Sequence, residues 1–206
     1  MRMKIRAVIF DLGGVLLRTT DVSPRERLAR RLGMSRSELE ELVFGGESGM
    51  QAQKGEISVN QHWENLARQL RYSPQQIKDL VDEFFAHDEL DLQLVEYIRL
   101  LHKQYKTGLL SNAWDDTRRV IEARWHFEDA FDEIIISSEE GILKPDPRIF
   151  RLALGRLEVE AGQVVFVDDM QRNVDGAISV GMQAIRFHDL QQTKLELERI
   201  LNGLDK

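Results

Sequence analysis

Cysteine is absent from this chain of 206 residues. Disulfide bonds and metal sites built from thiolates are therefore excluded. None of the five histidines forms a pair at zinc-binding spacing, so a zinc site is not expected. A metal ion bound to this chain would depend on oxygen ligands, which are the ligands that a hard cation such as Mg²⁺ prefers.

The chain also lacks an excess of positive charge, because 28 Lys and Arg face 35 Asp and Glu, for a net charge of −7. This balance is typical of a cytoplasmic protein and argues against a surface for nucleic acid or membrane. An apolar run follows the basic N-terminus from Ala7 to Leu17, but Asp11 interrupts it, and it is too short to cross a bilayer. No small-residue cleavage site follows. We therefore expect a buried strand rather than a signal peptide.

Short apolar runs predict five strands, and most of them are separated by helical patterns. The strands are expected at Ile5–Phe10, Thr107–Leu110, Glu133–Ile136, Val164–Val167 and Gln183–Phe187. Helices are expected over the apolar face of Leu92, Val95, Ile98 and Leu101, and over Asp116–Trp125, Arg148–Leu157 and Asn173–Val180. Alternating strands and helices indicate an α/β fold with a Rossmann-like parallel sheet.

The segment from Thr19 to Leu90 interrupts this alternation and contains no convincing strand. Four serines stand three residues before Glu or Gln, which is the capping-box pattern: Ser23/Glu26, Ser35/Glu38, Ser58/Gln61 and Ser73/Gln76. Pro24 and Pro74 fit the first helical position, and Gly33 and Gly45 fit helix ends. We expect residues 1–18 and 91–206 to form the α/β core, and residues 19–90 to form an inserted helical-bundle cap.

Polar side chains follow the predicted strands at the points where those strands end. They are Asp11, Ser111 with Asn112, Lys144, and Asp168 with Asp169. Ligands bind at the carboxyl ends of the strands in open parallel sheets, so we expect these side chains to converge on one rim. Clustered carboxylates repel one another unless a cation lies among them, which predicts a Mg²⁺ site.

A carboxylate next to Mg²⁺ can act as a nucleophile and form an aspartyl-phosphate. Lys144 would neutralise charge on the transferring group, and the Ser111 hydroxyl would bind a phosphoryl oxygen. Positioning and electrostatic stabilisation are most of what phosphoryl transfer requires. The residues thus predict a phosphotransfer site.

Four ordered motifs carry a resemblance to a known family. They are Phe10-Asp11-Leu12-Gly13-Gly14-Val15, Leu109-Leu110-Ser111-Asn112, Leu143-Lys144-Pro145-Asp146-Pro147 and Phe166-Val167-Asp168-Asp169. The set resembles the motifs of the haloacid dehalogenase (HAD) superfamily, and the helical insertion resembles that family's subclass I cap. The resemblance covers nearly the whole chain and implies a magnesium-dependent phosphatase acting on a small phosphorylated metabolite, as a monomer or homodimer.

The resemblance also implies roles for individual residues. Asp11 and Lys144 would be catalytic, with Asp11 as the nucleophile. The metal ligands would be Asp11, the Gly13 carbonyl, Asp169 and Asp168. Ser111 and Lys144 would bind phosphate with help from the Asn112 backbone, and Asn173 would brace the acidic loop.

One position departs from the family pattern. Most phosphatases of the family carry a second Asp two residues after the nucleophile, as general acid/base, and this chain has Gly13 there. General acid catalysis is worth ~10²–10⁴-fold. Three interpretations follow: another residue or a water supplies the proton, the substrate has a good leaving group such as an acyl or anomeric phosphate, or catalysis is weak. Members with this Asp-x-Gly pattern resemble sugar-phosphate phosphatases.

Two rival functions share these motifs. A metal-independent dehalogenase would also use an Asp nucleophile, but it would leave the Asp168-Asp169 pair unexplained. A phosphate-binding module with little or no catalysis would keep the site without its acid. A two-component receiver fits poorly, because about 120 residues suffice for that fold. Within the insertion, we expect His62 and Trp63 to be helix surface and core, and Trp114 to have a packing role.

Overall fold

The computed structural model describes residues 3–203, and its centre is a five-stranded sheet. The strands are β1 (Ala7–Phe10), β4 (Lys106–Ser111), β5 (Glu133–Ile136), β6 (Val164–Asp168) and β7 (Gln183–Arg186). Their order is β5-β4-β1-β6-β7, and every neighbouring pair is parallel. The predicted α/β class and all five predicted strands are confirmed; β5 has the predicted ends, and the ends of the other strands differ from the prediction by at most two residues.

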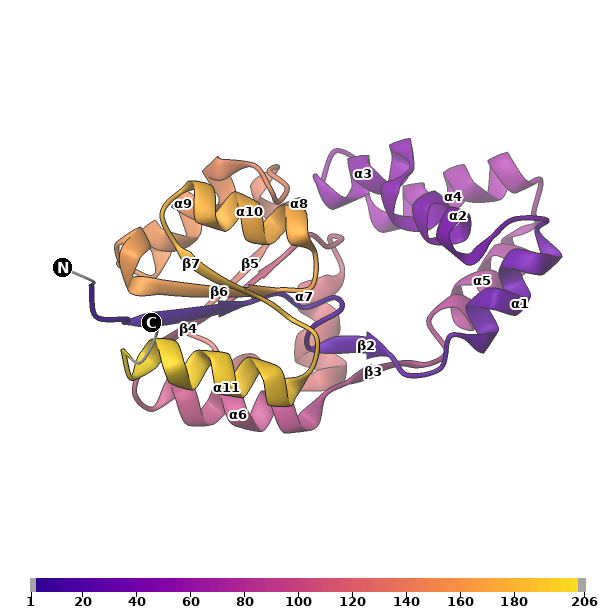
Figure 1. Cartoon of the computed structure of the whole chain (residues 1–206). Helices are drawn as coiled ribbons and strands as arrows, with labels where there is room; N and C mark the ends of the chain where they lie inside the picture. Colours follow the sequence, from indigo (N-terminus) through magenta and orange to yellow (C-terminus); the bar gives the residue numbers. More distant parts are fainter. Residues whose placement is uncertain (1–2, 204–206) are drawn as a thin grey trace.

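Helices cover both faces of this sheet (Figure 1). Helices α6 (Leu92–His102) and α11 (Leu190–Leu201) lie on one face, and α9 (Pro147–Arg156) and α10 (Gln171–Ser179) lie on the other. The strand residues alternate between two buried clusters. Val8 and Phe10 pack toward α6 and α11, whereas Ala7 and Ile9 pack toward α9 and α10. Both faces are therefore buried, which is why the strands are apolar runs without alternation.

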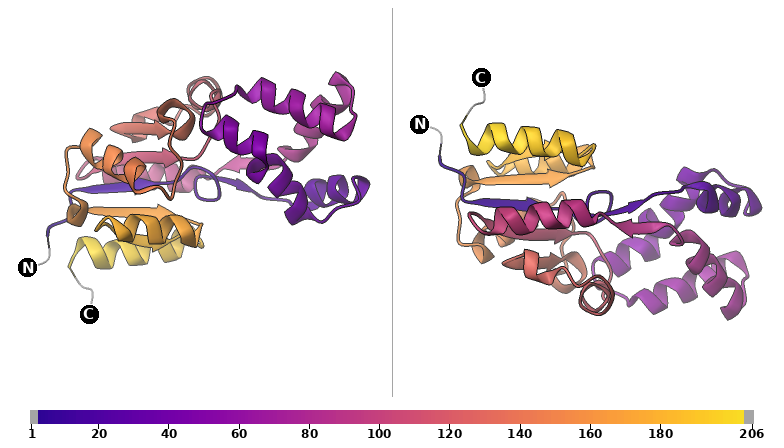
Figure 2. Two further views of the ribbon diagram at one scale, coloured as in Figure 1. Left: turned by 90° about the horizontal axis from the view of Figure 1, so that it is seen from above. Right: turned by 90° about the horizontal axis from the view of Figure 1, so that it is seen from below.

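A helical unit stands beside the sheet, at the carboxyl ends of its strands (Figure 2). It consists of α1 (Ser23–Arg31), α2 (Arg36–Glu40), the π-helical turn Glu41–Gly45, α3 (Glu47–Gln53), α4 (Val59–Leu70) and α5 (Pro74–Phe84). Its buried cluster is separate from the two clusters of the sheet. The chain enters and leaves it through an antiparallel pair, β2 (Leu17–Thr19) and β3 (Asp88–Leu90).

Three of the four predicted capping boxes are confirmed, at Ser35, Ser58 and Ser73. The fourth is wrong, because α1 already includes Ser23 and its N-cap is Val22. The Ser23 hydroxyl donates to the Asp21 carboxylate just upstream instead of capping the helix.

Two further expectations for the insertion are corrected. Gly33 has the left-handed backbone (φ +71°) expected after a helix, but Gly45 does not, because the chain continues there as a π-helical turn. The segment also contains strand β3, which pairs with β2. The short β2–β3 ladder therefore connects the helical unit to the sheet, where no strand was expected.

Several shorter elements complete the described part of the chain. They are α7 (Thr117–Val120), a π-helical turn at Ile121–Trp125, α8 (Ser137–Glu140), and 3₁₀ turns at Glu128–Ala130 and Ala161–Gln163. Leu92 is 67% exposed, so it does not belong to the apolar face of α6 as predicted. The buried face of this helix consists of Leu94, Val95, Ile98 and Leu101. None of the helices within residues 3–203 is long and apolar enough to cross a bilayer.

Candidate active site

Asp11 directly follows the central strand β1. Its backbone N–H donates to the Val167 carbonyl at 2.9 Å, which continues the pairing of β1 with β6 by one residue. The carboxylate turns inward and is 7% exposed. Its Oδ1 accepts from the Leu12 backbone N–H at 2.7 Å and lies 2.7 Å from Lys144 Nζ. A carboxylate is thus held on a rigid strand end, where it is oriented by two donors.

Asp168 and Asp169 reach the same place from the end of β6. One carboxylate oxygen from each, together with one from Asp11, lies within 4.8 Å of the others. Asp168 is fully buried, and Asn173 Nδ2 lies 3.0 Å from both of its oxygens. The predicted convergence of the three carboxylates is therefore present in the fold, and Asn173 braces the first of the pair.

Lys144 is the cation inside this acidic group. Its side chain is fully buried, and Nζ lies 2.7 Å from both Asp11 Oδ1 and Asp168 Oδ2. Burial alone would lower the pKa of Lys144, but the two carboxylates outweigh it and raise the pKa above its usual value. Lys144 therefore stays charged and neutralises part of the site.

The carboxylates retain an electrostatic cost despite this lysine. Burial raises the pKa of Asp11 to about 7, although the Lys144 ammonium opposes the change. Burial also raises the pKa of Asp169, and the neighbouring Asp168 charge adds to the effect. One cation for three carboxylates leaves negative charge uncompensated, and an oxygen-liganded divalent cation would relieve it. The residues present thus fit a Mg²⁺ ion.

Ser111 and Asn112 end strand β4, beside Asp11. Ser111 is 3% exposed, and its side chain makes no hydrogen bond within residues 3–203, so its hydroxyl is available to a ligand. The Asn112 side chain, in contrast to that of Ser111, is held by hydrogen bonds within the protein. It accepts from the Lys144 backbone N–H at 2.8 Å and donates to the Lys144 carbonyl at 2.9 Å. The motif residues indicated only a backbone role for Asn112, because this contact joins positions far apart in the sequence.

The two glycines after Asp11 have opposite surroundings. Gly14 has φ +78°, and a Cβ there would lie 2.4 Å from Asp169 Oδ2. At Gly13, by contrast, no atom of another element lies within 4 Å of where a Cβ would be. Gly14 is thus required for the approach of Asp169, a role that the sequence patterns did not indicate. Gly13 leaves open space where the family usually has an acid.

The helical unit contacts the core near the site as well as through β2–β3. Trp114, two residues after Asn112, packs into the aromatic cluster of the helical unit, with its ring 5.5 Å from that of Phe44. The Asp115 carboxylate accepts from the Val59 N–H at the start of α4 at 3.0 Å. The Ser137 hydroxyl donates to the Gln53 carbonyl at 2.6 Å. The helical unit is thus fixed to the core near the site, and the contacts of Trp114 give it the expected packing role.

The side chains of the helical unit named from the sequence are mostly structural. His62 is fully buried, bonds Ser48 through Nδ1 at 2.8 Å, and has a pKa lowered to about 4 by burial. Trp63 packs against the aromatic cluster. The fold therefore buries His62, which was expected at the helix surface, and gives Trp63 the expected core position.

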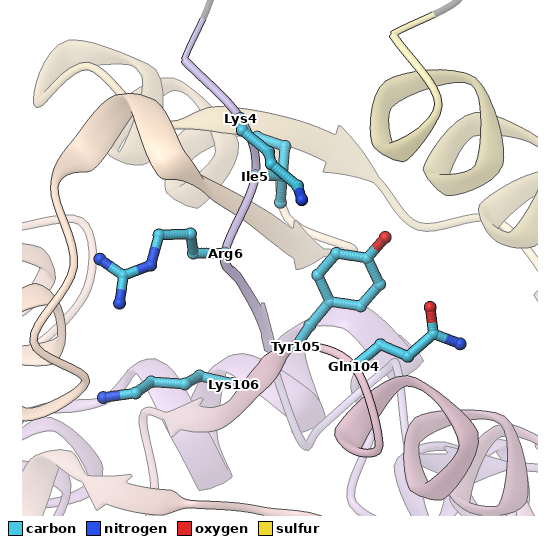
Figure 3. Close-up of a pocket in the computed structure, with 6 residues that line it drawn as sticks. All are labelled: Lys4, Ile5, Arg6, Gln104, Tyr105 and Lys106. Atoms are coloured by element: carbon cyan, nitrogen blue, oxygen red, sulfur yellow. The ribbon is translucent and has the colours of Figure 1, made fainter.

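A separate cavity of about 510 Å³ lies at the opposite, amino-terminal edge of the sheet (Figure 3). It is lined by Lys4, Ile5, Arg6, Gln104, Tyr105 and Lys106. No carboxylate, serine or histidine lines it, so it lacks the side chains that converge at the carboxyl ends of the strands. It is not part of the acidic site.

Known proteins resemble this chain in sequence and in fold. A family described as haloacid dehalogenase-like hydrolase matches residues 5–181. Bifunctional epoxide hydrolase 2 of Sus scrofa is 28% identical over 96% of this chain, which spans only 39% of that relative's length. The sesquiterpene phosphatase astK of Aspergillus oryzae is 25% identical over 95% of this chain and 96% of its own length.

A solved structure has the same fold. It is a HAD family enzyme of Bacteroides thetaiotaomicron in complex with magnesium and inorganic phosphate, with a TM-score of 0.74 and 21% identity. The match covers 92% of this chain and 98% of that one. The parallel sheet and its helical neighbour thus form a known architecture.

Proposed function

Because this chain belongs to the haloacid dehalogenase-like hydrolases, we propose that it is a magnesium-dependent phosphatase acting on a small phosphorylated metabolite through an aspartyl-phosphate on Asp11. One observation carries the proposal: three carboxylates lie within 4.8 Å of one another, with the Lys144 ammonium among them. A phosphatase-named relative and a neighbour crystallised with magnesium and phosphate support it.

The metal ion would be held by Asp11, Asp169 and the Gly13 carbonyl, with Asp168 beside them. When bound, it would supply positive charge next to a phosphoryl oxygen. The Ser111 hydroxyl would donate to a second phosphoryl oxygen, and Lys144 would neutralise the charge that develops during transfer. Each of these groups comes from the end of a strand or from the loop beside it, so their relative positions are set by the sheet.

In the first step, a carboxylate oxygen of Asp11 attacks phosphorus, and the bond from phosphorus to the leaving-group oxygen breaks. In the second step, water attacks the aspartyl-phosphate, releases inorganic phosphate and restores the carboxylate. The leaving group must gain a proton from water or from another residue, because Gly13 supplies none. We therefore expect substrates with a good leaving group, such as acyl or anomeric phosphates, to react fastest.

The helical unit would act as the cap of this site, with residues 19–90 as the cap and 1–18 and 91–206 as the core. Its contacts at Asp115 and Ser137 bring it against the loop that follows β4 and the start of α8 after β5. A cap in this place would exclude water and select the leaving group. We propose the cytoplasm as its location, given the charge balance of the chain.

Substitution of the nucleophile tests the proposal. Asp11→Asn should abolish turnover across a panel of sugar phosphates, nucleotides and acyl phosphates assayed with Mg²⁺. Above pH 7, where Asp11 is charged, it should also raise the melting temperature of the metal-free protein by about 2–4 °C, because a buried charge is removed. Retention of most of the wild-type activity by this variant would refute Asp11 as the nucleophile.

The same assays separate the rival functions. Hydrolysis of 2-haloacids that resists a chelator would favour the metal-independent dehalogenase. Binding of phosphate or BeF₃⁻ with Mg²⁺, without hydrolysis of any phosphoester in the panel, would favour the phosphate-binding module. Wild-type turnover that disappears on chelation and returns with Mg²⁺ is the result expected from the proposal.

A further inference from the structure

We infer that Asn112 is a positioning residue that sets the place of the Lys144 ammonium through the Lys144 backbone. The expected effect on phosphate binding and catalysis rests on the proposed function, whereas the contact between Asn112 and Lys144 does not depend on it. The Asn112 side chain forms two hydrogen bonds with one residue, to the N–H at 2.8 Å and to the carbonyl at 2.9 Å. A single amide thus fixes both backbone polar groups of Lys144.

The Lys144 backbone depends on this contact because it lies outside every helix and strand. It belongs to the segment between α8 and α9, and no backbone hydrogen bond of residue 144 to another backbone group occurs in residues 3–203. Buried backbone groups without partners are costly, and Lys144 is 3% exposed. Asn112 therefore supplies the partners that a helix or a strand would otherwise provide.

The position of the backbone determines where the charge lies. The Lys144 side chain is long and flexible, but its fully buried Nζ is held 2.7 Å from Asp11 and from Asp168. A shift of the backbone would move the ammonium away from the nucleophile, and small displacements of charged groups in such sites have large effects. Asn112 thus acts on the chemistry through Lys144.

Asn112 also links the two side chains proposed to bind phosphate. Ser111 precedes it at the end of β4, where it pairs with Ile136 in the register of the sheet. Because Asn112 directly follows Ser111, a contact that fixes Lys144 to Asn112 places the Ser111 hydroxyl and the Lys144 ammonium on one support at the end of β4. The amide oxygen and one amide hydrogen of the Asn112 side chain are engaged by the Lys144 backbone, so the side chain acts on the site by holding Lys144.

A double-mutant cycle distinguishes this role from a purely structural one. The variants are Asn112→Ala, Lys144→Met and the double variant. Lys144→Met is chosen because it keeps most of the side-chain volume and removes the charge. The readout is the affinity for inorganic phosphate in the presence of Mg²⁺, measured by calorimetry, with kcat/KM as a second readout. Asn60→Ala, an exposed position in α4, is the matched control.

Asn112→Ala should weaken phosphate binding about 10-fold when Lys144 is present and less than about 2-fold in the Lys144→Met background. An equal loss in both backgrounds, or no loss in either, would overturn the inference. If Asn112→Ala fails to fold, Asn112→Leu replaces it in the cycle. Leucine has nearly the branched shape of asparagine, removes both hydrogen bonds to the Lys144 backbone and adds no charge, so the difference between backgrounds still reports positioning.

Phosphate affinity requires no turnover, which keeps the two hypotheses separate. A wild-type protein that binds phosphate with Mg²⁺ but hydrolyses nothing would contradict the proposed function and leave the cycle interpretable. A wild-type protein that is active, but whose cycle is additive, would contradict the role of Asn112 alone.

Discussion

At the scale of single residues, the two adjacent glycines after Asp11 should respond oppositely to substitution. Apart from its chain neighbours, a Cβ added at Gly13 would meet no heavy atom within 4 Å, whereas one at Gly14 would clash with the Asp169 carboxylate. Gly13→Asp should therefore fold normally and place an acid near the leaving group. We expect it to raise kcat for alkyl phosphate esters by ~10-fold or more, because general acid catalysis is worth ~10²–10⁴-fold.

Gly14→Ala is the matched control, since it adds a smaller group one residue away and should abolish most activity. Steady-state kinetics on an alkyl and an acyl phosphate measure both effects. The gain from Gly13→Asp should be larger for the alkyl ester, whose leaving group needs the proton more. Equal gains for both substrates would mean that the new carboxylate does not act as an acid.

The two neighbouring aspartates of the site also differ. Asp168 already accepts hydrogen bonds from Lys144 Nζ, Asn173 Nδ2 and the Met170 N–H. The Asp169 carboxylate accepts none from another residue within 3–203, so its oxygens remain available to a cation. Asp169→Asn should thus weaken Mg²⁺ binding by about 10-fold or more, and Asp168→Asn should weaken it less. Titration of both variants with Mg²⁺ measures the two losses of affinity. A larger loss in Asp168→Asn than in Asp169→Asn would identify Asp168 as the principal ligand.

The site could be predicted only in part from single residues. Asp11, Asp168 and Asp169 were found because each follows an apolar strand, and the ends of parallel strands meet. The side-chain contact between Asn112 and Lys144 was not found, because it depends on the path of an irregular loop. The role of Gly14 depends on the approach of a carboxylate that is distant in sequence, which no local pattern reports.

At the scale of elements, burial decided which strands could be recognised. The five strands of the sheet are buried on both faces and stand out as apolar runs. Strands β2 and β3 have three residues each and are half-buried or exposed, so they have no such pattern. Helix α1 shows a similar limit: Ser23 matched the capping pattern, but Asp21 competes for its hydroxyl.

A single arginine connects the elements of the helical unit, which makes it a test of that unit's stability. Arg25 in α1 is 8% exposed, donates through Nε to the Phe84 carbonyl at 3.0 Å, and bonds both oxygens of Asp88 in β3. Arg25→Ala should lower the free energy of unfolding by about 3 kcal/mol, since it leaves Asp88 unpaired. The exposed Arg27→Ala on the same helix should change it by less than ~0.5 kcal/mol. Chemical denaturation measures both, and similar losses would contradict the role of Arg25.

At the scale of the whole molecule, the helical unit is joined to the sheet at two separate places. One is the β2–β3 ladder, and the other consists of the contacts of Trp114, Asp115 and Ser137. Sequence patterns indicated that a helical segment was inserted after β1, because its capping boxes are local. They did not indicate the second place of contact, because Trp114 and Asp115 lie in a loop and Ser137 begins the short helix α8, and tertiary packing sets where these residues lie.

The uncompensated charge of the site makes metal binding and stability depend on pH. Burial raises the pKa of Asp11 to about 7 from its ordinary 3.8, so the metal-free folded protein keeps a proton there that the unfolded chain releases. Between these two values the stability of the metal-free protein should therefore fall as pH rises. Mg²⁺ must displace that proton below pH 7, so its apparent affinity should drop by up to ~10-fold per pH unit below 7 and level off above it. Calorimetric titrations from pH 5.5 to 8.5 measure this dependence. An affinity that stays constant over this range would place the metal away from Asp11, whereas the expected slope should disappear in Asp11→Asn.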